Sequence, residues 1–175
     1  RDFRKPLVIM TPKSLLRHKG CVSSLADMGP GTTFHRVLDE RDTQVKSGKA
    51  KRVVMCSGKV YYDLAAARDE AKMWDVEIIR VEQLYPFPTR AVTEVLEQVP
   101  NATMVWCQEE PRNMGGWSFA RDFIEEAMQT VGASQQRLTY TGRAAAASPA
   151  TGTLGRHKRE QAQLVADALG LAADK

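Results

Sequence analysis

Three consecutive residues near the middle of the chain could bind an anion. Ser57, Gly58 and Lys59 follow an apolar run and open a pattern with helical spacing. Backbone N–H groups at a helix start lack intrahelical partners, and a hydroxyl and an ammonium beside them complete the ingredients of an anion site. The GxxxxGK[ST] pattern of a phosphate-binding loop is missing. Ordinary helix capping explains the same residues, and both interpretations stay open.

A second expected helix start carries further cations. Lys13, Ser14 and Arg17 follow the apolar run of residues 7–10 and the pair Thr11-Pro12. Because ligands of open α/β sheets collect beyond the carboxyl ends of the strands, we expect residues 11–17 and 57–61 to converge on one edge, with residues 83–88 and 108–116 beside them. The candidate site for an anionic effector comprises Lys13, Arg17, Ser57, Lys59 and Arg143.

Carboxylates and histidines predict no catalytic centre. Glu109 and Glu110 end an apolar strand, but adjacent residues point to opposite sides of a strand, so they do not form a facing acid–base pair. We expect one of them to pair with a basic group across an interface. His18, His35 and His157 have no cysteine or carboxylate at the spacing of metal ligands, and no metal site is predicted.

Short continuous apolar runs alternate with amphipathic helical patterns along the chain. Continuous runs of this kind are typical of strands that are covered on both faces. We therefore predict an α/β fold, a three-layer α/β/α sandwich in a single domain spanning residues 1–175. A polar loop is expected over residues 39–50. The predicted strands cover residues 7–10, 52–56, 76–81, 103–107 and 137–140, and the predicted helices 60–74, 91–99, 117–128 and a final one containing Leu164, Val165 and Ala168.

Composition agrees with a folded domain. Of the 175 residues, 43% are hydrophobic and 26% are charged, near the globular average. No apolar run is long enough to span a membrane, so we expect a soluble intracellular protein without a membrane partner. Cys21, Cys56 and Cys107 form no CxxC pair, and we expect them to be reduced. Because the chain begins at Arg1 without methionine, we expect a fragment of a longer protein.

One cluster of basic residues raises the alternative of a free-standing module that binds a nucleic acid or a protein. The net charge is +4, and the cluster comprises Lys46, Lys49, Lys51 and Arg52. No aromatic residue interleaves these cations, and Ser47-Gly48 interrupts them, so a solvated linker is the favoured interpretation. We therefore expect no nucleic-acid partner.

Five strings of residues, read in order, carry a family resemblance. They are KPLVIMTPKSLLRH (5–18), KRVVMCSGKVYYDL (51–64), IRVEQLYPFP (79–88), VWCQEEPRNMGGW (105–117) and YTGRAAAASPATG (140–152). In order and spacing they resemble the end of the decarboxylating, thiamine-diphosphate-dependent component of 2-oxoglutarate dehydrogenase. The resemblance covers nearly the whole chain.

The resemblance implies a transketolase-like parent enzyme. Such an enzyme binds thiamine diphosphate and Mg²⁺, decarboxylates 2-oxoglutarate and passes the succinyl group to the lipoyl arm of a succinyltransferase. In that family the cofactor motif and the catalytic histidines lie upstream, so we expect this segment to bind no cofactor and to be inactive alone. The family fold implied for it, the transketolase C-terminal-like fold, has a five-stranded mixed sheet with one antiparallel strand.

The role expected from the resemblance is assembly. The segment would pack against upstream domains and help to build a homodimer, and aromatic and methionine residues suit such interfaces. The 2-oxoadipate-acting relatives and a regulatory module for a nucleotide or an acyl-coenzyme A are the alternatives. Bacterial cytoplasm is the preferred location over the mitochondrial matrix. The candidate interface residues are Trp106, Glu109, Asn113, Met114 and Trp117.

Overall fold

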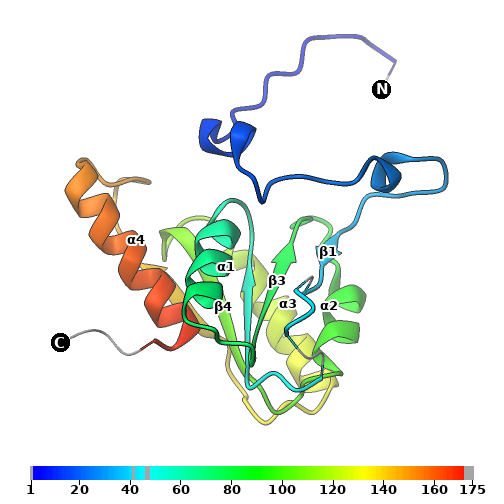
Figure 1. Cartoon of the computed structure of the whole chain (residues 1–175), viewed down its shortest axis with the longest axis vertical. Helices are drawn as coiled ribbons and strands as arrows, with labels where there is room; N and C mark the ends of the chain where they lie inside the picture. Colours follow the sequence, from blue (N-terminus) through cyan, green and yellow to red (C-terminus); the bar gives the residue numbers. More distant parts are fainter. Residues whose placement is uncertain (1, 41, 46–47, 172–175) are drawn as a thin grey trace. The chain divides into compact units, whose positions relative to one another are not determined.

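The structure, a computed structural model, describes residues 2–40, 42–45 and 48–171. These residues form two compact units, 1–33 and 34–175, and every strand and α-helix of the described residues belongs to the second unit (Figure 1). The single domain expected over residues 1–175 stays a prediction. In the described part of the chain, the helices are too short or too polar to cross a membrane.

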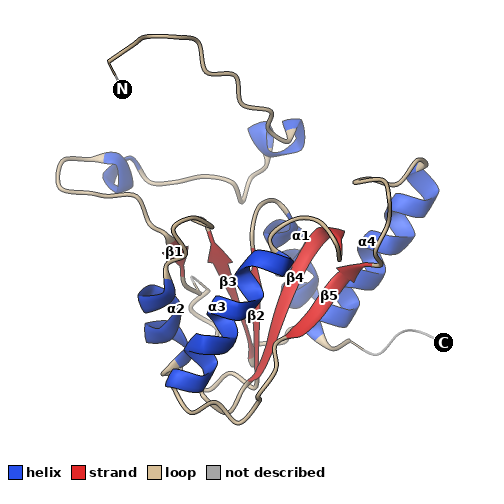
Figure 2. Cartoon of the chain, turned by 180° about the vertical axis from the view of Figure 1, so that it is seen from behind, coloured by secondary structure: helices blue, strands red, loops and turns tan. Residues whose placement is uncertain are grey.

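A five-stranded mixed sheet forms the centre of the second unit (Figure 2). Its strands are β1 (Val37–Leu38), β2 (Arg52–Cys56), β3 (Val76–Val81), β4 (Thr103–Pro111) and β5 (Thr139–Arg143). They lie in the order β1-β3-β2-β4-β5. β1 runs antiparallel to β3, and the other neighbours are parallel. The prediction of a mostly parallel mixed sheet with one antiparallel strand is confirmed.

Two helices cover each face of the sheet. They are α1 (Val60–Glu70), α2 (Thr89–Leu96), α3 (Trp117–Thr130) and α4 (Leu154–Leu169). Along β2, Val53 and Met55 point into the core under α2 and α3, whereas Val54 and Cys56 point into the core under α1 and α4. Because successive strand residues face opposite sides, a strand that is apolar throughout needs both layers. The predicted three-layer sandwich is confirmed.

The strand predicted over residues 7–10 is wrong for this sheet. Leu7–Met10 form no strand, and their side chains are between 68% and 90% exposed. The short strand β1 takes the place of the fifth strand by pairing with β3. The physical reason is that no described neighbour offers Leu7–Met10 a backbone to pair with. Two boundaries also differ, since β4 extends to Pro111 and β5 covers Thr139–Arg143 rather than 137–140.

Residues 2–33 of the first unit have little regular structure. They contain two 3₁₀ helices, η1 (Lys13–Arg17) and η2 (Leu25–Met28). In η2 the hydroxyl of Ser24 accepts from Ala26 N, and the Asp27 carboxylate accepts from Ser24 N, which together cap the turn. None of the described residues in this unit is buried.

A buried ion-pair network holds the predicted loop over residues 39–50 to the sheet unit. The Arg68 guanidinium of α1 is 2% exposed and pairs with Glu40 at 2.5 Å and with Asp42 at 3.4 Å. The same Glu40 oxygen accepts a hydrogen bond from Ile78 N at 2.9 Å. The network therefore joins the loop to α1 and β3. Removing Arg68 would leave the Glu40 carboxylate, whose side chain is 8% exposed, without its cation.

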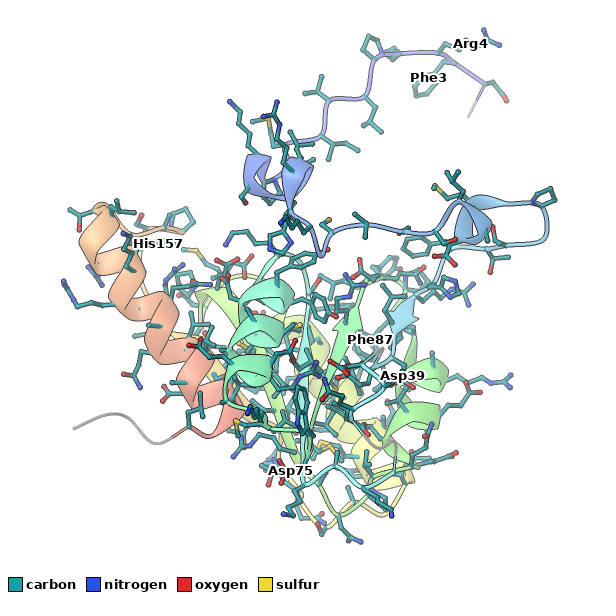
Figure 3. The ribbon with its side chains drawn as sticks, in the orientation of Figure 1. Phe3, Arg4, Asp39, Asp75, Phe87 and His157 are labelled. Atoms are coloured by element: carbon teal, nitrogen blue, oxygen red, sulfur yellow. The ribbon has the colours of Figure 1, made fainter. Side chains whose placement is uncertain are left out.

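Beside this network lies a buried carboxyl group for which the described residues provide no paired cation. Glu77 of β3 is 3% exposed, and its Oε1 has no hydrogen-bond partner among the described residues. Burial, followed by the neighbouring carboxylates of Asp39 and Glu40, raises the pKa of Glu77 from 4.5 to about 7. A hydrogen bond from the Gly48 backbone lowers the pKa of Glu77 and so offsets part of this rise. Figure 3 labels Asp39 on the loop beside β3.

The raised pKa predicts how stability changes with pH. Because Glu77 titrates at a higher pH in the folded than in the unfolded chain, ionising it above pH 7 lowers the free energy of unfolding. This penalty shrinks as the pH falls through 7 and vanishes below about 4.5. Glu77→Gln should therefore stabilise the protein at pH 8 by about 1–3 kcal/mol. Urea unfolding between pH 4 and 9 measures the gain, with Glu97→Gln as an exposed control. A gain that is the same at every pH contradicts this explanation.

Candidate functional site

The carboxyl ends of three neighbouring strands meet at one edge of the sheet. Ser57 and Lys59 follow β2, Glu109 lies near the end of β4, and Arg143 ends β5. Gly58, with a φ of +79°, makes the turn from β2 towards α1 that a side chain would strain. The predicted convergence of residues 57–61 and 108–116 is confirmed by the order of β2 and β4 in the sheet.

Two cations of the predicted anion site lie in the other unit. Lys13 and Arg17 bound the 3₁₀ helix η1, and both are exposed there. Whether they join the edge of the sheet stays a prediction. Within the second unit, Ser57, Lys59 and Arg143 lie at the ends of strands on one sheet edge.

Lys59 forms an ion pair within the chain. Its Nζ donates to Glu109 Oε1 at 2.5 Å, and the two side chains are 32% and 18% exposed. Glu109 thus finds its basic partner on the neighbouring strand connection, so the expected pairing across an interface is not needed. An anionic ligand at Lys59 would have to compete with this carboxylate.

Arg143 connects three elements. Its side chain is 10% exposed. Nη1 donates to Glu109 O at 2.6 Å on β4, and Nη2 donates to Gln161 Oε1 at 3.1 Å on α4. Nη2 also lies 3.1 Å from His157 Nδ1, which must accept because a guanidinium only donates. Nε lies 3.1 Å from Glu160 Oε2, close enough for an ion pair but without the alignment of a hydrogen bond. Figure 3 labels His157 on α4.

A pocket of about 340 Å³ opens next to Arg143. Most of its wall is the small-residue segment 144–152, which follows β5. Asn113 holds this segment: its Nδ2 donates to Ala146 O, and its Oδ1 accepts from Ala146 N, both at 3.0 Å. The 110–117 connection and the 144–152 segment are therefore fixed to each other.

Charged groups gather at one end of this pocket. Glu160 lies between Arg143 and Arg156, whose Nε donates to Glu160 Oε1 at 2.6 Å. The hydrogen bond from Arg156 lowers the pKa of Glu160, and Arg143 adds to this effect. An anionic ligand at this end of the pocket would have to compete with Glu160 for the two guanidinium groups.

A buried amide positions the whole connection from β4 to α3. Gln108 is 2% exposed, and its Oε1 accepts from Trp106 Nε1 at 3.0 Å and from Trp117 N at 2.9 Å. Its Nε2 donates to Met114 O at 2.7 Å and to Pro111 O at 3.2 Å. Sequence reasoning placed Gln108 only within a range. Its position between Trp106 and Trp117, before the Gly115-Gly116 turn, is the sequence feature that could have indicated this role.

Two of the five candidate interface residues are buried within the chain. Trp106 is 1% exposed and Trp117 is 6% exposed, and both belong to the core beneath α2 and α3. Large aromatic side chains suit both a domain core and an interface, and in this chain the two tryptophans belong to the core. Asn113 is exposed and Met114 is half-buried, so these two remain accessible to a partner.

An aromatic patch, which we define as Tyr85, Phe87, Phe119 and Phe123, was missed by the sequence reasoning. Tyr85 is 83% exposed, and its ring lies 6.3 Å from that of Phe119. The rings of Phe87 and Phe123 stack at 5.1 Å, and Phe119 joins them at 5.2 Å from Phe123. The patch brings the β3–α2 connection and α3 together. No pattern in either segment alone reveals it.

The thiols offer no reactive nucleophile at this edge. Cys56 and Cys107 are register partners on β2 and β4, and both are buried. Burial raises the pKa of both, that of Cys107 to about 12, so both stay protonated near neutral pH. All three cysteines are free thiols, as expected. Nowhere in the described ranges do three histidine, cysteine or carboxylate side chains gather to hold a metal ion.

Comparison with known proteins decides the family. The family model described as 2-oxoglutarate dehydrogenase C-terminal matches residues 22–169. The chain belongs to this family. It is 51% identical over 178 residues to the 2-oxoglutarate dehydrogenase E1 component of Brucella ovis, and 50% identical to that of Brucella abortus. Each match covers 97% of this chain and 18% of the relative. The predicted resemblance is confirmed, and this chain spans about a fifth of the length of these relatives.

Among solved structures, the chain is similar to a split-gene transketolase described as an inactive β4 tetramer. The TM-score is 0.47 at 16% sequence identity, and the match covers 82% of this chain and 45% of that chain.

The amide of Gln108 gives a sharp prediction for stability. Gln108→Leu leaves the N–H groups of Trp106 Nε1 and Trp117 without their acceptor, and unsatisfied buried donors cost about 1–3 kcal/mol each. The free energy of unfolding should therefore fall by about 2–5 kcal/mol. Denaturant unfolding measures the loss, with Gln129→Leu as an exposed control on α3. A variant as stable as the control would show that this amide does not position the connection.

Proposed function

We propose that this chain is the C-terminal assembly domain of a 2-oxoglutarate dehydrogenase E1 component. The parent enzyme would decarboxylate 2-oxoglutarate and transfer the succinyl group to the lipoyl arm of a succinyltransferase. The observation that carries the proposal is the identity of 51% to such E1 components over 97% of the chain. That match covers only 18% of the relatives, so the chemistry is assigned to the parent and not to this segment.

In the parent, thiamine diphosphate and Mg²⁺ would supply the chemistry of decarboxylation. We propose that both bind outside this segment, in line with the lack of three clustered histidine, cysteine or carboxylate side chains among the described residues. The ionic groups at the sheet edge are paired with each other, as in Lys59 with Glu109 and Arg143 with Glu160. Such pairs fix the positions of β4, β5 and α4. We therefore assign no chemical step to this chain.

The aromatic patch supports a role in assembly. A large exposed tyrosine beside partly exposed phenylalanines is the composition that is enriched in interface cores. Met114 and Asn113 lie on the connection that leads into α3, where Phe119 and Phe123 lie. We propose that the patch contacts the second subunit of a homodimer of the parent enzyme.

The assembly role predicts the behaviour of a charged patch in the full-length E1 component. Tyr85→Asp combined with Phe119→Asp places two carboxylates in the proposed interface, which should raise the dimer dissociation constant at least about tenfold. Light scattering and sedimentation over a dilution series measure this constant. Leu154→Asp, at an exposed leucine on α4, is the matched control. A dimer that dissociates at the same concentration in both variants contradicts the proposed patch.

A second candidate function is the binding of an anionic effector such as a nucleotide or an acyl-coenzyme A. The observation that favours it is the pocket of about 340 Å³ whose end holds Arg143 and Arg156 around a carboxylate. Ser57 and Lys59 lie on the same sheet edge. Lys13 and Arg17 belong to the first unit, and their contribution to this site stays a prediction.

Titration calorimetry of the full-length protein with ATP and with acetyl-coenzyme A tests this site. The variant Arg17→Ala, Lys59→Ala should bind about tenfold more weakly, because each charge-assisted hydrogen bond contributes on the order of 1 kcal/mol or more. Lys72→Ala, at an exposed lysine beyond α1, controls for the loss of positive charge. Unchanged affinity in the double variant would count against the effector site.

Other features bear on the remaining alternatives. A parent enzyme that acts on 2-oxoadipate stays the alternative, because the substrate pocket is expected upstream of this segment. A bacterial cytoplasmic location is supported by the bacterial source of the relatives.

The basic cluster has structural partners within the chain. Lys51 pairs with Asp75, and Arg52 donates to Ala168 O, which favours structural roles over nucleic-acid binding. Lys46 lies outside the described residues.

A further inference from the structure

The segment Leu7–Met10 has the sequence of a strand but no neighbour to pair with. All four side chains are apolar, and they are 83%, 81%, 68% and 90% exposed in chain order. In an extended strand Leu7 and Ile9 face one side while Val8 and Met10 face the other. Both faces of such a strand therefore need an apolar cover, which is the situation of a strand within a parallel sheet flanked by helices.

The backbone of this segment is equally unpartnered. In the described part of the chain, no backbone hydrogen bond joins residues 7–10 to another segment. The run ends at Thr11-Pro12, where proline removes an N–H and so ends a ladder, and the helical turn η1 follows at once. An apolar strand followed by a helical turn is the repeating element of α/β sheets.

The comparisons separate this segment from the C-terminal domain. The family model begins at residue 22, so residues 1–21 lie outside it. Yet 97% of the chain matches the E1 components, which leaves only about 5 of 175 residues unmatched, too few to exclude residues 7–10. Residues 7–10 therefore lie within the stretch that aligns with the E1 components but outside the part matched by the family model.

We propose that Leu7–Met10 is a strand of a parallel α/β sheet in the domain that precedes residue 22 in the full-length E1 component. The partner is the open edge of that upstream sheet, with helices on both of its faces. Residues after Pro12 then lead from that domain to the sheet unit of residues 34–175. This inference rests on the proposed function in one respect, that the chain is part of a longer E1 component. Beyond the proposed function, it names the segment that docks, Leu7–Met10, and the surface that receives it, the edge of a sheet.

Hydrogen exchange of the full-length E1 component tests the strand directly. Because a strand on an edge donates to its one neighbour from every second residue, either the amide of Ile9 or those of Val8 and Met10 should exchange at least about 100-fold more slowly than in an unstructured peptide of the same sequence. Exchange at the rate of the free peptide would overturn the proposal. Protection that disappears on dilution of the dimer would also overturn it, because it would make a second copy the occupant.

Two single substitutions test whether both faces are covered. Val8→Asp and Ile9→Asp place a charge on opposite faces, and each should lower the melting temperature of the full-length protein by several degrees. Lys5→Asp introduces the same carboxylate just outside the run and should not. If an aspartate variant does not fold, Val8→Thr, which keeps the shape but adds a hydroxyl, gives the same comparison. If either variant melts at the same temperature as the unsubstituted protein, the strand is not covered on both faces.

The two proposals fail in different ways. A full-length protein without 2-oxoglutarate decarboxylation would contradict the proposed function, while the protection of residues 8–10 would still report the strand. Loss of protection in an active enzyme would contradict only the strand.

Discussion

The buried amide of Gln108 is the interaction on which the candidate site depends. It lies where β4 leaves the sheet, and it satisfies the indole of Trp106, the first amide of α3 and two carbonyl groups of the connection between them. Space there is tight, because a Cβ at Gly115 would lie 3.0 Å from this amide and one at Gly116 would lie 3.0 Å from the Trp106 ring. Once the connection is fixed, Asn113 is in place to hold the 144–152 segment.

Ion pairs then join the strand ends to one another. Lys59 reaches from the start of α1 to Glu109, and Arg143 links the backbone of Glu109 to Glu160 of α4. Each pair joins elements that are distant in sequence, so the edge behaves as one unit across β2, β4 and β5. Paired charges of this kind favour a role in fixing surfaces over a role in proton transfer. Apart from these pairs, the unit exposes the aromatic side chains of Tyr85 and Phe119.

Apolar periodicity predicted much of this fold, and the limits of that prediction have physical causes. The strands over residues 52–56 and 76–81 were predicted with their observed bounds, because continuous apolar runs report burial on both faces. The same pattern at residues 7–10 predicts burial but not the sheet that provides it. The ion pairs could not be predicted, since Lys59 and Glu109 are 50 residues apart. The family assignment came from the five sequence segments that resemble the E1 components, because apolar periodicity carries no information about family.

We propose that residues 34–175 assemble the parent enzyme and do not perform its chemistry. The most direct measurement is the mass of the full-length E1 component after deletion of these residues, determined by light scattering together with the affinity for thiamine diphosphate. We expect the deletion to abolish the dimer and to weaken cofactor binding. A deleted protein that remains a dimer, binds the cofactor with full affinity and decarboxylates 2-oxoglutarate would contradict it.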